Sequence, residues 1–217
     1  MSRPLKGVVM DRSARSARML AFAVASALLF AACGGDGAEE PTGAPPATET
    51  AAPTGEPTAT TSPSADAGRY ENAEYGFTID HPSTWVVDES PQGGAVVQLV
   101  AVTSAAASLP ANINVVVEDL PFDLTARQYL DIGWEKLKPQ LSDLEEIDTG
   151  ELTVGDLPAA SLEYRGRFEG MPGVGHFYQV AVLDGRRAFV FTYVGNDAAF
   201  ETHRAEAEAI VDSFAVT

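Results

Sequence analysis

From about residue 69 to the end of the chain, apolar residues recur with a spacing that switches between two and about 3.6. A spacing of two is typical of strands that bury one face. Pro82 lacks an N–H and disfavours helix at the residue before it, so the first strand should end at His81. We predict strands at 75–81, 85–87, 95–102, 113–118, 145–152, 160–168, 176–183 and 188–194.

Two segments have helical spacing instead. Residues 124–137 place an apolar stripe on one face, and Thr125 with Gln128 forms a capping-box pattern at the start. Pro139 follows as a stop signal. Residues 197–214 repeat apolar positions every three or four residues. Strands in hairpin order with one helix between them and one after them predict an α+β domain built on an antiparallel sheet of about six to seven strands.

The first 32 residues are of another kind. Five basic residues and one acidic residue precede the uncharged run at 19–32. Because a bilayer-spanning helix needs about 20 apolar residues, this length is typical of a secretory signal peptide. The long basic region leaves Met1 and Met10 as alternative starts.

Cys33, the sole cysteine, follows this segment directly. Residues 30–33 read Phe-Ala-Ala-Cys and resemble the lipobox of bacterial lipoproteins, which prefers Leu, Val or Ile where Phe30 stands. The resemblance implies an acylated Cys33 that anchors the mature chain in the membrane. The alternative is an ordinary signal peptide followed by a chance cysteine.

Residues 33–68 are predicted to form a tether. They lack Leu, Ile, Val and aromatic residues and are rich in Thr, Pro, Gly, Ala and acids. Such a segment cannot bury enough apolar surface to offset its ordering entropy, so we expect a disordered spacer. Its Thr-Pro runs are either bare or O-glycosylated. The folded domain is then 69–217, and with one cysteine it has no internal disulfide.

The charge balance argues against two classes of partner. The chain has 14 basic and 31 acidic residues, a net charge of −17, and the part after residue 32 is more acidic still. Nucleic-acid binding depends on neutralising phosphates with basic residues, so no nucleic acid is expected. A protein face that adheres to anionic lipid is disfavoured for the same reason, which leaves the lipid on Cys33 as the attachment to the membrane.

Motifs for catalysis or metal binding are missing from the sequence. There is no Gly-x-Ser-x-Gly elbow, no His-Glu-x-x-His and no cysteine pair. The glycine-rich run at 170–175 opens no predicted helix, so a loop is favoured over a phosphate site. Carboxylates at 145–151 lack the spacing of a calcium loop and indicate a solvated strand edge. We expect no cofactor, no metal and no catalytic residue.

The histidines are the remaining candidates for a site. His81 ends the first strand, and an acidic neighbour at Asp80, Asp88 or Glu89 would let it titrate near neutral pH or bind a metal. His176 opens a strand beside the glycine-rich run, where we expect it to be exposed to solvent. Both are candidate ligand contacts. His203 lies on the apolar stripe of the last helix and is interpreted as packed and hydrogen-bonded.

A family resemblance is carried by three features. Residues 75–85 read YGFTIDHPSTW, residues 155–159 read GDLPA, and a final hairpin and helix close in Ser213-Phe214. This order resembles PsbP-like domains, which share a fold with the yeast Ran-binding protein Mog. With the lipobox and the tether, the chain is most similar to LpqN-type lipoproteins of actinobacteria. Within this pattern Phe77, Pro82 and Trp85 are interpreted as structural residues.

The resemblance implies an α-β-α sandwich with a central antiparallel sheet and does not imply an enzyme. Our leading hypothesis is a non-catalytic module, anchored at the outer face of the cytoplasmic membrane, that binds an envelope ligand or protein through a groove at one end of the sheet. The alternatives are a structural assembly factor and an envelope hydrolase or esterase without a recognisable motif.

Overall fold

The computed structural model describes residues 68–91 and 93–217. The predicted signal peptide, Cys33 and nearly all of the tether lie outside these residues. Two short 3₁₀ turns, η1 (Val102–Ser104) and η2 (Lys138–Gln140), join larger elements. The strands and helices are β1 (Gly68–Asn72), β2 (Phe77–His81), β3 (Trp85–Asp88), β4 (Val97–Ala101), β5 (Asn112–Asp119), α1 (Ala126–Leu137), β6 (Leu141–Val154), β7 (Leu157–Phe168), β8 (Gly175–Asp184), β9 (Arg187–Gly195), α2 (Asp197–Asp212) and β10 (Ala215–Val216).

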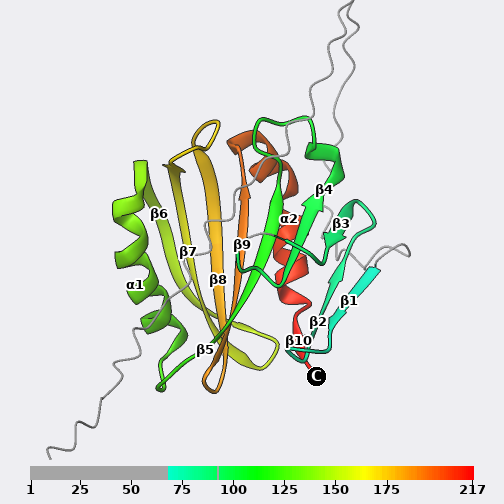
Figure 1. Ribbon diagram of the computed structural model, residues 1–217, viewed down its shortest axis with the longest axis vertical. Coiled ribbons are helices and arrows are strands. Elements are labelled where there is room, and N and C mark those ends of the chain that lie inside the picture. The colour runs from blue at the N-terminus through cyan, green and yellow to red at the C-terminus, as the bar shows by residue number, and fades with distance from the viewer. Residues whose placement is uncertain (1–67, 92) are drawn as a thin grey trace, which may run out of the picture.

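A seven-stranded antiparallel sheet forms the centre, in the order β3-β4-β5-β9-β8-β7-β6, and a three-stranded sheet β1-β2-β10 lies beside it. Helix α1 packs on β6, β7 and β8, whereas α2 packs on β8, β9 and β2 (Figure 1). The two helices bury different faces, so the predicted α+β sandwich is confirmed.

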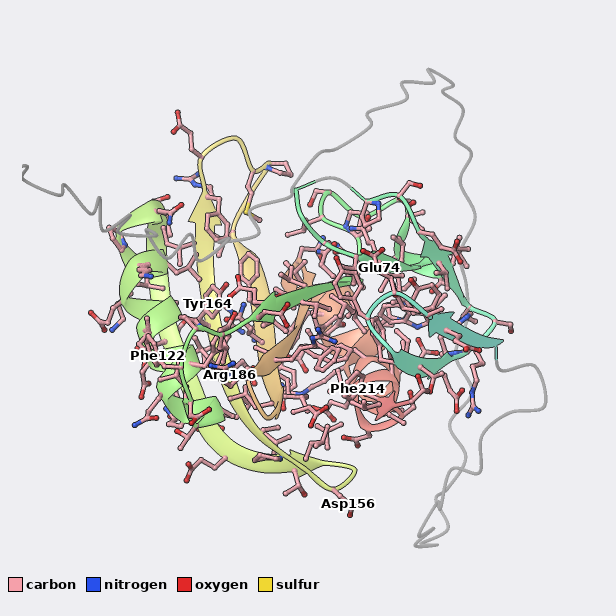
Figure 2. The ribbon with its side chains drawn as sticks, turned by 60° about the horizontal axis from the view of Figure 1, so that its bottom comes forward. Glu74, Phe122, Asp156, Tyr164, Arg186 and Phe214 are labelled. Carbon is pink, nitrogen blue, oxygen red and sulfur yellow. The ribbon has the colours of Figure 1, made fainter. Side chains whose placement is uncertain are left out.

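Each face of the central sheet carries its own core, because successive strand residues point to opposite sides. On the α2 side Phe77, Phe189 and Phe214 form a contacting aromatic group. On the α1 side Trp134 packs on Tyr164, which stacks on Phe177. Figure 2 shows Tyr164 next to α1 and Phe214 next to α2.

Several local signals hold in detail. The side chain of Thr125 accepts from the Gln128 backbone, and the Gln128 side chain accepts from the Thr125 backbone, which completes the capping box. Strand β2 ends at His81, before Pro82. Gly185 has φ of 57° in the turn between β8 and β9, a conformation that glycine adopts without a steric penalty.

The predicted strands differ from the observed ones at the edges. We predicted neither β1 nor β10, and β2 begins at Phe77 where we expected residue 75. Strand β6 covers 14 residues, longer than the predicted 145–152. Within residues 68–91 and 93–217, no helix is long and apolar enough to cross a membrane.

Candidate ligand-binding site

A row of neutral polar side chains crosses the central sheet on the side of α1. Gln98 of β4 lies opposite Asn114 of β5, Asn114 lies opposite Thr192 of β9, and Thr192 lies opposite Gln179 of β8. Because these positions alternate with the residues of the α2-side core, their side chains share the other face. Adjacent strands are about 4.8 Å apart, so the row is about 14 Å long. We call Gln98, Asn112, Asn114, Gln179 and Thr192 the amide row.

Hydrogen bonds fix the orientation of these side chains. Asn112 is 7% exposed and its Oδ1 accepts from Gln98 Nε2 at 3.2 Å and from Asn114 Nδ2 at 3.0 Å. Its own Nδ2 donates to the Pro110 carbonyl at 2.9 Å. The Oδ1 of Asn112 therefore accepts two hydrogen bonds within the protein and holds two neighbours in place. Gln179 Nε2 donates to Thr192 Oγ1 at 3.2 Å.

The row keeps acceptors for a ligand. Gln98, Asn114 and Gln179 each donate to a neighbour within the row, and their side-chain carbonyl oxygens accept no hydrogen bond from the residues that the structure describes. All three side chains are half-buried, so these oxygens are accessible at an ordered surface. Such oxygens bind O–H and N–H donors.

Among residues 68–91 and 93–217, no helix packs extensively on β4 or β5. Helix α1 packs on β6, β7 and β8, and Figure 1 shows it at that side, with β4 and β5 uncovered at the other. Val86 and Val100, a cross-strand pair on the same face, are 55% exposed and half-buried, respectively. The open area therefore combines the amide row with apolar surface.

Tyr129 of α1 marks the boundary of the open area. Its hydroxyl donates to Glu118 Oε2 of β5 at 2.9 Å. Burial raises the pKa of Tyr129 far above its ordinary value, and the Glu118 carboxylate raises it further. The phenol therefore stays protonated and keeps donating, which fixes α1 beside β5.

His176 is buried, whereas the sequence led us to expect it to be exposed to solvent. Its side chain is 2% exposed, so the expectation of an exposed residue is wrong. The ring stacks on Phe200 of α2, with centroids 3.6 Å apart, and this contact explains the burial. Nε2 donates to Glu163 at 2.8 Å, and Nδ1, which lies 3.4 Å from Asp197, makes no hydrogen bond with the described residues.

Glu163 is the centre of this buried cluster. Arg204 of α2 donates to both of its oxygens, at 3.1 and 2.8 Å. Burial alone would raise the pKa of Glu163, but the hydrogen bonds from Arg204 and His176 outweigh it, and the pKa lies below its ordinary value of 4.5. The cluster joins α2 to β7 and β8, which indicates a structural role for His176.

His203 belongs to a second cluster that joins α2 to β3 and η1. Its Nδ1 donates to Glu206 at 2.9 Å, and its Nε2 lies 3.1 Å from Thr103 Oγ1, which then acts as the donor. Trp85 Nε1 also donates to Glu206, at 2.8 Å. Burial would raise the pKa of Glu206, but the bonds from His203 and Trp85 keep it below its ordinary value. The order hydroxyl, imidazole and carboxylate is that of a hydrolase triad.

His81 lies apart from both clusters. Its Nδ1 is 3.1 Å from the Pro82 carbonyl, and its ring lies over Gly68, where an added Cβ would approach the ring to 2.6 Å. Asp80 makes a two-point ion pair with Arg69, and no contact of His81 with Asp88 or Glu89 is present among the described residues. Within residues 68–91 and 93–217, no group of three or more His, Cys, Asp or Glu side chains is arranged to hold a metal ion.

A groove is present at one end of the central sheet, where β6 begins and β7 ends. It has a volume of about 510 Å³. Arg167, its only basic group among the lining residues, is already paired with Asp143 at 3.0 Å. The lining consists of Pro139, Gln140, Leu141, Ser142, Arg167, Phe168, Glu169, Gly170 and Met171.

Sequence reasoning missed the amide row. A signal was available, since Gln98, Asn114 and Gln179 each interrupt an otherwise apolar strand. The pairing of β5 with β9 brings these side chains together. The two strands are about 75 residues apart in the chain, so no local sequence pattern predicts their pairing. Phe77 and Trp85 are buried as expected, at 0% and 2% exposure.

Comparison with known families identifies the relatives of this fold. The family model described as DcrB matches residues 78–213, well over half of the chain. The chain belongs to the DcrB family. No curated protein sequence matches it.

Three solved structures show where this DcrB-family domain stands among known folds. The solution structure of cyanobacterial PsbP from Synechocystis sp. PCC 6803 is similar with a TM-score of 0.54 at 17% identity, over 74% of this chain and 98% of that one. LpqN, described as involved in cell envelope biogenesis of Mycobacterium tuberculosis, has a TM-score of 0.54 at 18% identity, over 70% and 90%. The Saccharomyces cerevisiae Ran-binding protein Mog1p has 0.50 at 11%, over 70% and 96%. The PsbP-like and Mog-like fold is therefore confirmed.

Proposed function

We propose that this DcrB-family domain is a non-catalytic binding module that takes up a neutral, hydroxyl-rich component of the cell envelope at the amide row. The observation that carries the proposal is the row itself, four strands wide and held in place by the buried Asn112. The oxygens of Gln98, Asn114 and Gln179 match ligand hydroxyls. No residue of the row carries a charge, so nothing in it compensates a charged ligand.

The proposed setting is the outer face of the cytoplasmic membrane, as for an LpqN-type lipoprotein of actinobacteria. The signal-peptide pattern at 1–32 and the lipobox-like sequence before Cys33 support this setting. A lipid on Cys33 and a tether at 34–68 would hold the domain near the membrane while keeping it clear of the headgroups.

Binding to a neutral oligosaccharide tests the proposal. We expect a linear glucose hexasaccharide to bind the purified chain, and Asn114→Ala with Gln179→Ala to weaken binding about 10-fold or more. The expectation follows from about 0.5–1.5 kcal/mol for each lost hydrogen bond. Gln140→Ala is the matched control, since it removes an amide from the end groove.

The outcome separates the two surfaces. Loss of binding in Gln140→Ala, with the double variant unaffected, would move the site to the groove. Failure of neutral oligosaccharides to bind at all, in calorimetry up to millimolar concentration, would contradict the proposed ligand class.

Ester hydrolysis is a second candidate function, because Thr103, His203 and Glu206 stand in the order of a triad. Glu206 also accepts from Trp85, and the cluster joins three elements, which favours a structural role. We expect p-nitrophenyl acetate to be hydrolysed no faster than by free imidazole at the same concentration. Turnover that disappears in Thr103→Ala would replace the binding proposal with an enzyme.

A further inference from the structure

The outer edge of β6 is the longest unpaired strand edge in the part of the chain that the structure describes. Strand β6 pairs with β7 on one side and is the last strand of the central sheet. Residues 142–149 are all exposed. Figure 2 shows β6 running along the outside of the molecule toward Asp156. An edge of this kind presents backbone N–H and C=O groups in a row and is a template for an added strand.

Regular pairing is confined to the second half of the edge. The register between β6 and β7 shifts between Ser142 and Glu145 and again between Glu146 and Asp148. Asp143 has φ of 53°, the only positive value among non-glycine residues that the structure describes. From Asp148 to Val154 the register is continuous, so this segment has the geometry that an added strand requires.

The side chains of β6 specify the charge of an added strand. Strand β6 has no basic residue. It has five carboxylates: Asp143, Glu145, Glu146, Asp148 and Glu151. Arg167 and Arg165 pair with Asp143 and Glu145, but Asp148 has no ion-pair partner among the described residues. Leu144 and Ile147, 39% and 40% exposed, add apolar surface beside these acids.

A second copy of the same chain fits this edge poorly. In-register parallel pairing of two β6 strands, and antiparallel pairing centred on Glu151, would bring carboxylates opposite carboxylates, and like charges opposite one another destabilise a sheet. A net charge of −17 disfavours the encounter as well. A basic segment is instead attracted by the negative charge of the chain at long range, and its basic side chains pair with the carboxylates of β6 at contact.

We propose that Asp148–Val154 of β6 binds an extended, basic and partly apolar segment of another protein, which adds as a strand to the central sheet. Asp148 and Glu151 are three positions apart and therefore lie on opposite faces of the sheet, so a lysine or arginine on each face of the added segment meets one of them. Apolar side chains just beyond contact Leu144 and Ile147. The bulges between Ser142 and Asp148 limit the added strand to about seven residues and prevent open-ended sheet growth. The surface is separate from the amide row and its proposal does not depend on the row.

Hydrogen exchange with a defined peptide tests this proposal. The probe is an acetylated and amidated heptapeptide with Lys at positions 1 and 4 and Val at the others, added to the purified chain at low salt, so that one lysine lies on each face of the added strand. We expect those backbone amides of 148–154 that point away from β7 to exchange at least 10-fold more slowly when the peptide is bound, with no change in the amide row. A Glu-Val heptapeptide of the same length should not bind.

Charge-reversal variants complete the test. Asp148→Lys with Glu151→Lys should weaken peptide binding at least 10-fold. Glu74→Lys is the control for either single variant, because it reverses one charge elsewhere, and it should leave the dissociation constant within twofold. Glu74 lies far from Asp156 in Figure 2. Equal weakening by Glu74→Lys, or slowed exchange outside 141–154, would overturn the proposal. Concentration-dependent dimers that the double variant abolishes would also overturn it in favour of a second copy.

Discussion

Two carboxylates, the buried Glu163 and the half-buried Glu206, organise the polar contacts between α2 and the rest of the domain. Glu163 accepts hydrogen bonds from His176 and Arg204. Glu206 accepts them from His203 and Trp85. Each carboxylate joins residues from two or three elements that are distant in sequence. Three of the five histidine and tryptophan side chains, His176, His203 and Trp85, donate to these carboxylates, which gives them a structural role.

Trp85→Ala should destabilise the domain by about 3–5 kcal/mol, because the ring is 2% exposed and packs against Tyr193 and His203. The loss also leaves Glu206 without one of its donors. Urea unfolding followed by circular dichroism measures the change. Val86→Ala is the control, since Val86 is 55% exposed and should change stability by no more than about 0.5 kcal/mol. Similar losses in both variants would contradict the core position of Trp85.

Acid should remove stability through Glu163 and Glu206. Both pKa values lie below the ordinary 4.5 in the folded protein, so the unfolded chain binds protons first as pH falls. Their contribution is fully present above about pH 4.5 and is lost as pH falls through the lower folded values. Urea midpoints between pH 7 and pH 3 measure it, and Glu163→Gln should show a shallower decline than the wild type. If the urea midpoints of the two proteins fell equally with pH, Glu163 would be excluded as a source of the acid-dependent loss of stability.

Helix and strand signals were readable where they are local. The capping box at Thr125, the stop of β2 at Pro82 and the hairpin turn at Gly185 depend on neighbours within a few residues. β1 and β10 were missed because they are short and rely on β2 for their pairing. The start of β6 was missed because the register shift between Ser142 and Glu145 breaks the alternation that the prediction used.

Thr125→Ala should destabilise the domain by about 1 kcal/mol, because the backbone N–H of Gln128 loses its acceptor, the Thr125 hydroxyl, and the capping box is broken. Denaturant unfolding of the two proteins measures the difference. Thr202→Ala is the control. Thr202 is exposed within α2 and its hydroxyl donates to the Ala198 carbonyl of its own helix, so its change should stay within about 0.5 kcal/mol. An equal effect of both changes would mean that the cap contributes nothing specific.

The whole molecule combines a predictable architecture with a surface that was not predictable. Sandwich, antiparallel sheet and the positions of both helices followed from periodicity and from the resemblance to PsbP-like domains. The amide row did not, since its members come from β4, β5, β8 and β9 and are aligned only by long-range pairing. Burial of His176 likewise depends on Phe200, 24 positions away.

Cys33→Ser tests the proposed anchoring of the whole chain. We expect the wild-type protein in the membrane fraction of the producing cells and the variant in the soluble or secreted fraction, because the described domain offers no membrane-crossing helix of its own. Fractionation and immunoblotting measure the distribution. Ser64→Ala, a change in the tether, is the control. Equal membrane association of the two variants would contradict attachment through Cys33.

Side-chain amide signals of Asn and Gln in nuclear magnetic resonance spectra test the central claim most directly. The spectra are recorded while the linear glucose hexasaccharide is added to the purified chain. The amide row predicts saturable shifts of the Gln98, Asn114 and Gln179 side-chain amides, with the signals of Gln140 and Gln128 unchanged. Shifts confined to Gln140 and its groove, or saturable binding that moves none of the three, would contradict it.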